Sequence, residues 1–201
     1  MGHSQAEKAQ SREKIVTAAA EQIRKGGLDN LSIGELMRSV NLTHGGFYGH
    51  FPSRSALIAA ALERALEDGE KASLATTTTR GPRTLKSVAN SYLSPLHRDR
   101  VAEGCAVSAL AHDVARADEA VRAIMQARLT RFFDETAALL GDDASVRADA
   151  LKTWCLMTGA LSLARVFQGQ ETSDEILRVA RDAVLALEEA RGAARAPQSP
   201  T

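Results

Sequence analysis

Apolar side chains recur every three or four residues along most of the chain, and this spacing marks one face of an α-helix. The first such stretch begins near Arg12. Its apolar face comprises Ile15, Val16, Ala19, Ala20 and Ile23. A cationic last turn at Lys25 and the pair Gly26-Gly27 then predict a left-handed stop. Ala, Leu, Arg and Glu dominate and β-branched runs are absent, so the pattern predicts an all-α protein.

Three short features follow in close order. Ser32 stands at a helix N-cap with Glu35 three positions later, as in a capping box. Asn41 falls where a tight turn needs a residue tolerant of positive φ, and Thr43 is the next available N-cap. After Pro52-Ser53 a long amphipathic helix begins. A short helix, a tight turn and a second short helix are typical of a helix-turn-helix.

Later apolar stripes, which follow breaks at 76–79 and 81–82, predict longer helices. They are expected at about 84–96, 104–117, 118–140, 145–167 and 173–191. The layout is about nine helices. We expect a helix-turn-helix domain at 1–55, a helical effector-binding and dimerisation domain at 56–191, and a disordered tail at 192–201.

Composition narrows the function classes. Hydrophobic residues make up 44% of the chain and charged residues 25%, as in soluble globular proteins. No apolar run could cross a bilayer and the N-terminus lacks a secretory core, so we expect a cytoplasmic protein without a membrane partner. Lys plus Arg and Asp plus Glu are 25 each, so any DNA-binding patch must be local.

The chain offers no chemistry for a cofactor or a metal. Cys105 and Cys155 are too few for a disulfide framework or a four-ligand zinc site. His97 and His112 form no metal-ligand set with them. The sequence also lacks a nucleophile-base pair and a glycine-rich phosphate loop. We therefore expect no cofactor and no metal, and a helical enzyme or small-molecule carrier is the least supported alternative.

The first 60 or so residues resemble the TetR family of transcriptional regulators. The segments that carry the resemblance are Leu31-Ser32-Ile33, Glu35-Leu36, Leu42-Thr43, Gly46-Phe47-Tyr48, His50-Phe51-Pro52-Ser53-Arg54 and Leu57. The block from Thr43 to Arg54 is the most specific part. The resemblance implies a homodimer that binds a palindromic double-stranded DNA operator and answers to a small-molecule effector.

The resemblance also implies roles within the recognition segment, which runs from Leu42 to Phe51. Phe47 and Phe51 are expected to be scaffold. Tyr48 and Arg54 are expected to anchor backbone phosphates, because a phenol and a guanidinium at a helix start both suit an anion. The alternative for Tyr48 is that it belongs only to the core of a three-helix unit.

Base reading is assigned to the front of the recognition segment. A Thr can touch a thymine methyl, a His can donate to guanine, and two glycines leave the backbone unobstructed. The predicted DNA-binding set is Ser32, Thr43, His44, Gly45, Gly46, Tyr48, His50 and Arg54. Relatives commonly carry lysine where this chain has His44, so we expect affinity to depend on pH and salt. His50 could equally be a packing residue.

In the C-terminal part, the helices at 145–167 and 173–191 are expected to form a dimer interface, as this family's terminal pair does. Small residues at Gly159, Ala160 and Ala164 would allow close approach, although packing within one chain is the alternative. An effector pocket would be lined by large groups of this region, each of which could instead be core. The predicted set is Tyr92, Cys105, His112, Met125, Leu129, Phe133, Trp154 and Met157.

Cys105 raises a different hypothesis. Gly104-Cys105 opens a predicted helix, where the helix dipole favours a thiolate. Similar placements occur in TetR-like regulators of electrophile or oxidant response, so a redox-switched repressor is the alternative function. A small, buried and inert thiol is the competing interpretation. Cys155, beside Trp154, is expected to be packed.

Overall fold

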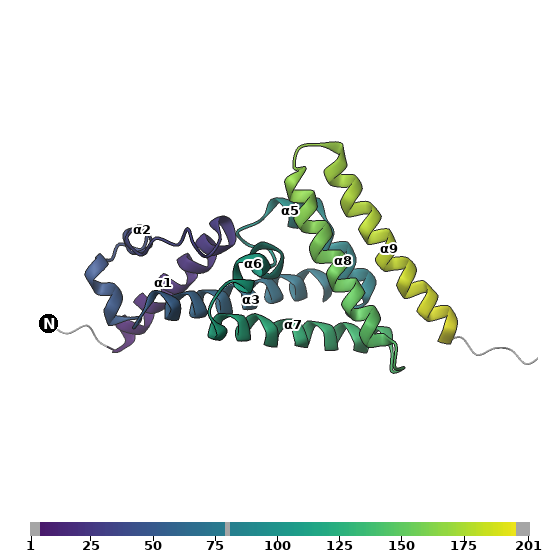
Figure 1. The fold of residues 1–201 in the computed structure, drawn as a ribbon, viewed down its shortest axis with the longest axis horizontal. Helices are drawn as coiled ribbons and strands as arrows, with labels where there is room; N and C mark the ends of the chain where they lie inside the picture. Colours follow the sequence, from purple (N-terminus) through teal and green to yellow (C-terminus); the bar gives the residue numbers. More distant parts are fainter. Residues whose placement is uncertain (1–4, 79–80, 196–201) are drawn as a thin grey trace, which may run out of the picture. The chain divides into compact units, whose positions relative to one another are not determined.

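The computed structural model describes residues 5–78 and 81–195, and all regular elements in those ranges are helical (Figure 1). The elements, in order, are α1 Gln5–Gly26, α2 Ile33–Ser39, the 3₁₀ helix η1 His44–Gly49, α3 Arg54–Thr78, α4 Leu85–Tyr92, α5 Pro95–Asp99, α6 Ala106–Ala115, α7 Glu119–Leu140, α8 Val146–Val166 and α9 Glu171–Arg195. The prediction of an all-α fold is confirmed. No helix in the described ranges is long and apolar enough to span a membrane.

Several predicted boundaries need correction. The helix expected at 84–96 is two helices, because Ser94 accepts a hydrogen bond from the His97 amide and starts a new helix with Pro95 in its first turn. α1 begins at Gln5 rather than near Arg12. The tail expected to be disordered from residue 192 is helical as far as Arg195, and residues 196–201 lie outside the described part.

The chain divides into two compact units. Unit 1 runs to Glu70 and includes Val101–Arg128, whereas unit 2 comprises Lys71–Arg100 and the residues from Leu129 onward. The expected division near residue 55 therefore does not match the packing. The reason is that α6 packs on α1, so the segment from 101 to 128 belongs with the N-terminal helices.

Unit 1 is built around the predicted apolar face of α1, whose five members are all buried. Leu36 and Met37 of α2 and Phe47 of η1 are fully buried as well. Burying each such side chain contributes about 1.5–3 kcal/mol. Because α2 and η1 are short, this shared core, rather than intrinsic helix propensity, holds them in place.

A buried cation joins three segments of unit 1. The Arg24 side chain is only 3% exposed, and its guanidinium donates to the carbonyls of Ala65 on α3 and Ala102 before α6. Burial lowers the pKa of Arg24, while the nearby Asp68 carboxylate opposes that shift. Removing this side chain would leave two carbonyls without these donors, so Arg24 fixes the segment that leads into α6.

Unit 2 contains the hairpin of α8 and α9, with α4 packed on both helices (Figure 1). Its aromatic centre is Trp154, whose ring stacks on Phe132 at 4.8 Å and meets the edge of Tyr92 at 5.7 Å. The indole Nε1 donates to Thr136 Oγ1 at 2.8 Å, which satisfies the one polar atom of the buried indole. The centre is thus a packed and hydrogen-bonded cluster.

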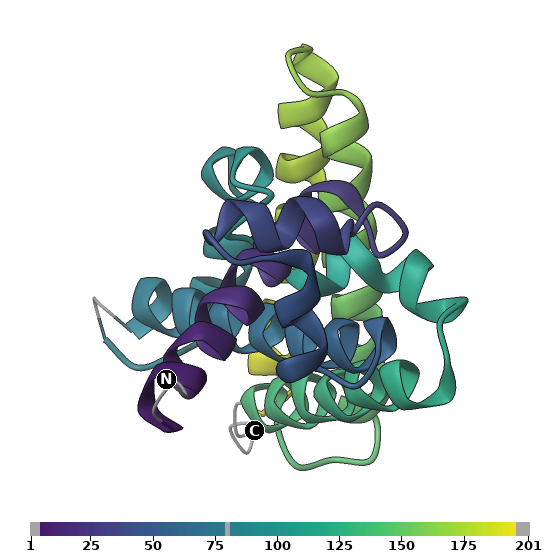
Figure 2. The same cartoon turned by 90° about the vertical axis from the view of Figure 1, so that its left-hand side faces the viewer.

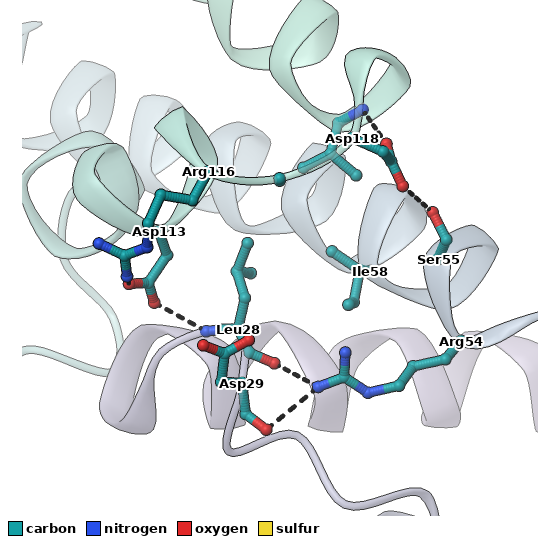
Figure 3. A pocket seen from close by; sticks show the side chains of 10 residues that line it. Leu28, Asp29, Arg54, Ser55, Ile58, Asp113, Arg116 and Asp118 are labelled. Carbon is teal, nitrogen blue, oxygen red and sulfur yellow. Dashed lines mark hydrogen bonds and ion pairs between the residues drawn. The ribbon is translucent and has the colours of Figure 1, made fainter.

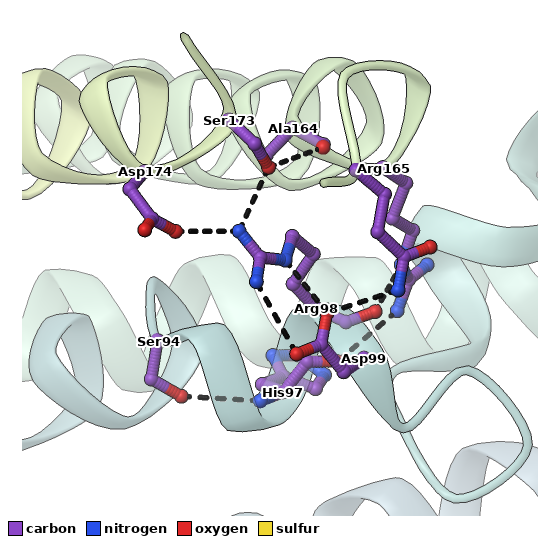
Figure 4. A network of polar contacts seen from close by, with 9 residues as sticks. Ser94, His97, Arg98, Asp99, Ala164, Arg165, Ser173 and Asp174 are labelled. Carbon is purple, nitrogen blue, oxygen red and sulfur yellow. Dashed lines mark hydrogen bonds and ion pairs between the residues drawn. The ribbon is translucent and has the colours of Figure 1, made fainter. Parts of the chain in front are cut away.

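A polar network fastens α5 to the α8–α9 hairpin (Figure 4). The Arg98 guanidinium donates to Ser173 Oγ at 2.8 Å and to Asp174 at 2.5 Å. Ser173 is fully buried and donates in turn to the Ala164 carbonyl at 2.6 Å. The side chain of Arg165 donates back to the Arg98 carbonyl. One arginine therefore ties together three helices of unit 2.

We expect Arg98→Ala to lower the free energy of unfolding by about 2 kcal/mol, because it removes charge-assisted hydrogen bonds to a buried hydroxyl and two carboxylates. Arg178→Ala is the matched control, since its one ion pair among the described residues is with Asp182 on an exposed surface of α9. That change should cost less than about 0.5 kcal/mol. Urea unfolding measures both, and equal effects would contradict the role given to Arg98.

Acid should destabilise unit 2. The pKa of Asp143 is held well below its usual value by hydrogen bonds from Ser145 and Arg191, and that of Asp149 is lowered by Lys152 and Arg191. The unfolded chain then binds more protons than the native one below about pH 5, so stability is present above the unfolded pKa and lost as pH falls. Urea midpoints between pH 6 and pH 3 should show this loss, and Arg191→Gln should reduce it. A loss of the same size in that variant would contradict the assignment.

Candidate nucleic-acid interface

The segment from α2 to η1 has the local features of a tight helical turn. Ser32 caps α2 by accepting a hydrogen bond from the Glu35 amide at 3.4 Å. Asn41 adopts φ 59°, and the Leu42 amide donates to the Met37 carbonyl at 2.8 Å. The N-cap predicted at Ser32 and the positive φ predicted at Asn41 are thus confirmed, and the positive φ is what reverses the chain after α2.

η1 is a six-residue 3₁₀ helix. Thr43 occupies its N-cap position with extended backbone, but the Thr43 side chain makes no cap hydrogen bond. A Cβ added at Gly45 or Gly49 would meet no atom within 4 Å, so the backbone is open on those sides. The hydroxyl of Thr43 is therefore not used to stabilise the helix that it begins, in contrast to that of Ser32.

Phe47 attaches η1 to the core of unit 1. Its ring is fully buried, stacks on Phe51 at 5.8 Å and meets Tyr48 edge to face at 5.1 Å. Phe51 is 2% exposed, whereas Tyr48 is 67% exposed. The prediction that Phe47 and Phe51 are scaffold is confirmed, and the Tyr48 phenol lies at the surface. Figure 2 turns α1, α2 and η1 toward the viewer.

The predicted base-reading residues share the exposed surface of η1. Thr43, His44, Gly45 and Gly46 are all exposed. A Cβ at Gly34 of α2 would lie 3.8 Å from His44 Cδ2, so the imidazole lies beside α2. The structure thus brings together five predicted DNA-binding residues on one short element, and we call Thr43, His44, Gly45, Gly46 and Tyr48 the η1 surface.

His50, at the end of η1, is half-buried. Its Nδ1 is buried, with no hydrogen-bond partner among the described residues. Burial lowers the pKa of His50, and the positive charges of Lys8 and Arg12 lower it further. The Arg12 guanidinium lies 4.9 Å above the Phe51 ring. Sequence reasoning missed Lys8 and Arg12 as neighbours of η1, although their spacing of four residues on one helix was visible.

Arg54 has partners within unit 1. Its Nη2 donates to the carbonyls of Leu28 at 2.6 Å and Asp29 at 3.1 Å (Figure 3), and its Nε donates to the Leu31 carbonyl at 3.4 Å. These carbonyls belong to the loop between α1 and α2, so Arg54 holds that loop against the start of α3. Its expected contact with a backbone phosphate stays a prediction.

The same corner holds a polar pocket of about 290 Å³ (Figure 3). Asp113 of α6 accepts a hydrogen bond from the Leu28 amide at 2.9 Å. A Cβ added at Gly27 would lie only 2.5 Å from the same carboxylate. Asp118 accepts from Ser55 and from the Val121 amide at the start of α7. The Asp113 and Asp118 carboxylates thus accept hydrogen bonds from other groups of unit 1. We therefore interpret the pocket as the junction between the end of α6, the start of α7 and the start of α3. None of the predicted effector residues lines it.

The predicted effector set is divided between the units. Cys105, His112 and Met125 belong to unit 1, and the other five members, Tyr92, Leu129, Phe133, Trp154 and Met157, belong to unit 2. Within unit 2, Tyr92 and Trp154 are in ring contact and Met157 is fully buried. His112 is exposed and bonded to Arg116. Within unit 2 the structure therefore brings Tyr92 and Trp154 together, and the effector set as a whole stays a prediction.

The two cysteines lie in different surroundings. Cys105 is half-buried at the N-cap position of α6, as expected from Gly104-Cys105. Cys155 is exposed on α8, so the prediction that it is packed was wrong. Its neighbour Trp154 takes the inward position instead. Among the described residues there is no cluster of His, Cys, Asp and Glu that could hold a metal.

Comparison with known proteins gives a family match over the N-terminal part of the chain. Residues 15–61 match the family described as "Bacterial regulatory proteins, tetR family". The "Uncharacterized HTH-type transcriptional regulator YvdT" of Bacillus subtilis (strain 168) is 43% identical over 54 residues. That match covers 27% of this chain and spans 28% of the relative's length.

Solved structures extend the likeness to the whole fold. A TetR-family transcriptional regulator from Cytophaga hutchinsonii is 19% identical, with a TM-score of 0.76 over 92% of this chain and 98% of that one. A TetR regulator from Chloroflexus aurantiacus J-10-FL gives 0.77 at 19% identity, over 90% and 95%. Reduced NemR of E. coli gives 0.71 at 19% identity, over 87% and 95%. Residues 15–61, which contain α2, η1 and the start of α3, thus match the TetR family of bacterial regulatory proteins, and the chain shares its fold with solved TetR-family regulators.

Proposed function

We propose that this chain is a homodimeric repressor that reads a palindromic operator with the η1 surface and leaves it when a small molecule binds unit 2. The observation that carries the proposal is the contrast within η1. Phe47 is fully buried, while the polar groups on either side of it are exposed. A short helix that is held by a buried ring on one side and exposes polar groups on the other suits insertion into a major groove.

Each group of the η1 surface supports a distinct contact. The exposed Tyr48 phenol can donate to a phosphate while its ring stays against Phe47. The unused Thr43 hydroxyl and its methyl group suit a base edge, and His44 can donate to guanine. The open backbone at Gly45 allows close approach to the groove. Tyr48 would position the protein, and the two residues before Gly45 would select sequence.

Dimerisation is supported by apolar side chains that α8 and α9 leave exposed. On α8, Leu156, Leu163 and Val166 are 39%, 55% and 75% exposed, and Gly159 lies exposed between them. On α9, Val179 is 53% exposed. These α8 positions recur at three- and four-residue spacing, so they form a stripe that a second copy could cover. A two-fold dimer would place two η1 surfaces on the two halves of a palindrome.

In the proposed function, unit 2 binds the small-molecule effector. The aromatic group around Trp154, with Tyr92 and the buried Met157, is an apolar cluster of predicted effector residues that could open around an apolar ligand. A ligand that favours one arrangement of the dimer over another would change the spacing of the two η1 elements and so release the operator.

Removing one hydroxyl at a time distinguishes a residue that recognises bases from one that only binds the phosphate backbone. Thr43→Val should leave the melting temperature unchanged but lower the ratio of affinities for cognate and scrambled duplexes. Tyr48→Phe should weaken both duplexes alike, by about three- to tenfold, because one hydrogen bond is worth about 0.5–1.5 kcal/mol. Fluorescence polarisation with the chain's own upstream DNA measures both. Ser32→Ala is the control for a lost cap, with stability lower by about 1 kcal/mol.

The absence of salt-sensitive, sequence-selective binding by the unaltered chain would contradict the proposed function. An unchanged affinity ratio in Thr43→Val would remove Thr43 as a reader while leaving the phosphate role of Tyr48. Arg54→Ala is a poor probe of DNA contact, because loss of its bonds to the loop carbonyls should lower both stability and affinity.

The dimer interface is tested by placing a charge on the exposed stripe. Leu163→Glu should convert the dimer to monomer at micromolar concentration, because it buries a carboxylate at an apolar contact. Leu96→Glu is the matched control, since Leu96 is 59% exposed on α5, outside the hairpin. Sedimentation velocity reports the state. A dimer that survives Leu163→Glu, or one that Leu96→Glu also disrupts, would count against the proposed interface.

A further inference from the structure

Two cations near the start of α1 lie in a position that is unfavourable in the free protein. Lys8 and Arg12 are exposed and four residues apart, so like charges face each other across one helical turn. In the described part of the chain neither forms an ion pair with an acid. An anion bound between them would relieve the repulsion between the two cations.

Most other arginines of unit 1 are engaged internally. Arg24 pairs with Asp68, Arg64 with Glu13, Arg116 with Asp113 and Arg128 with Glu70. Arg54 is bonded to loop carbonyls. The charge of Lys8 and Arg12 therefore remains available to a partner, while these arginines are largely neutralised or tied down.

The position of this pair relates it to η1. The Arg12 guanidinium lies over Phe51, which stacks on Phe47, the ring that anchors η1. The charges of Lys8 and Arg12 both act on His50, the residue that ends η1. Lys8 and Arg12 precede the segment matched by the family, which starts at residue 15. Their placement therefore follows from this chain's own structure and not from the shared motif.

We propose that Lys8 and Arg12, bordered by His50, form an anion site that binds a backbone phosphate of the operator beside the groove that η1 enters. The inference rests on the proposed function and adds a contact to it. A phosphate fits because it would neutralise the repulsion between the two cations and reduce their field at His50. Such a contact carries no sequence information, so it should strengthen binding to every duplex.

The test measures affinity against salt. Fluorescence polarisation with the upstream duplex and with a scrambled duplex of equal length should show Lys8→Ala and Arg12→Gln each weakening both, by about three- to tenfold. The ratio between duplexes should stay the same, and the slope of log affinity against log salt should become shallower by about one for each variant. Lys25→Ala is the matched control, because it removes the same charge about 25 Å away, at the other end of α1. It should change neither quantity.

Arg12→Gln also removes a contact with Phe51, so its melting temperature is measured beside the affinity. Lys8→Ala removes no hydrogen bond or ion pair among the described residues, so it tests the site even if Arg12→Gln unfolds. Normal affinity and salt slope in Lys8→Ala would overturn the site while leaving the proposed function intact. An equal loss in Lys25→Ala would also overturn it, because general charge would then explain the effect. No DNA binding by the unaltered chain would reject the proposed function and this site together.

Discussion

The burial of the Phe47 ring is the interaction on which the presentation of η1 depends. A six-residue 3₁₀ helix is too short to be stable alone, because its few hydrogen bonds do not offset the entropy of fixing the backbone. Phe47 stacks on Phe51, and the Arg12 guanidinium of α1 lies over the Phe51 ring. The adjacent residues are then exposed by geometry, since neighbours on a tight helix cannot all face inward. A rigid apolar attachment thus produces a polar surface.

Around this core, arginine side chains act mainly as internal connectors. Arg24 donates to carbonyls on two segments of unit 1, Arg54 holds the loop before α2, and Arg98 fastens α5 to the hairpin of unit 2. A guanidinium suits this work because its donors are fixed in a plane and it remains charged when partly buried. The balanced composition therefore has a structural reason, since many cations serve carbonyls and carboxylates of the same chain.

Local sequence signals predicted local structure well. Ser32, Asn41 and the glycine after α1 each act as their chemistry indicates, because caps and positive φ depend on a few neighbouring residues. The break between α4 and α5 was also visible at Ser94-Pro95, but the apolar spacing around it suggested one helix. The assignment of α6 to unit 1 could not be foreseen, because the approach of Asp113 to Gly27 joins residues far apart in sequence. The bonds of Arg54 could not be foreseen for the same reason, since its partners lie in another loop.

The most direct measurement is cleavage of DNA from a reagent placed on η1 itself. Gly49 is exposed, and a Cβ there would meet no atom within 4 Å, so Gly49→Cys in a chain with Cys105 and Cys155 replaced by serine can carry an iron chelate. If η1 enters the groove, cleavage of the upstream duplex should fall in two short stretches related by two-fold symmetry, about one helical turn or a multiple of it apart. Diffuse cleavage, or localised cleavage only when the chelate is moved to α8, would contradict the assignment of η1 as the reading element.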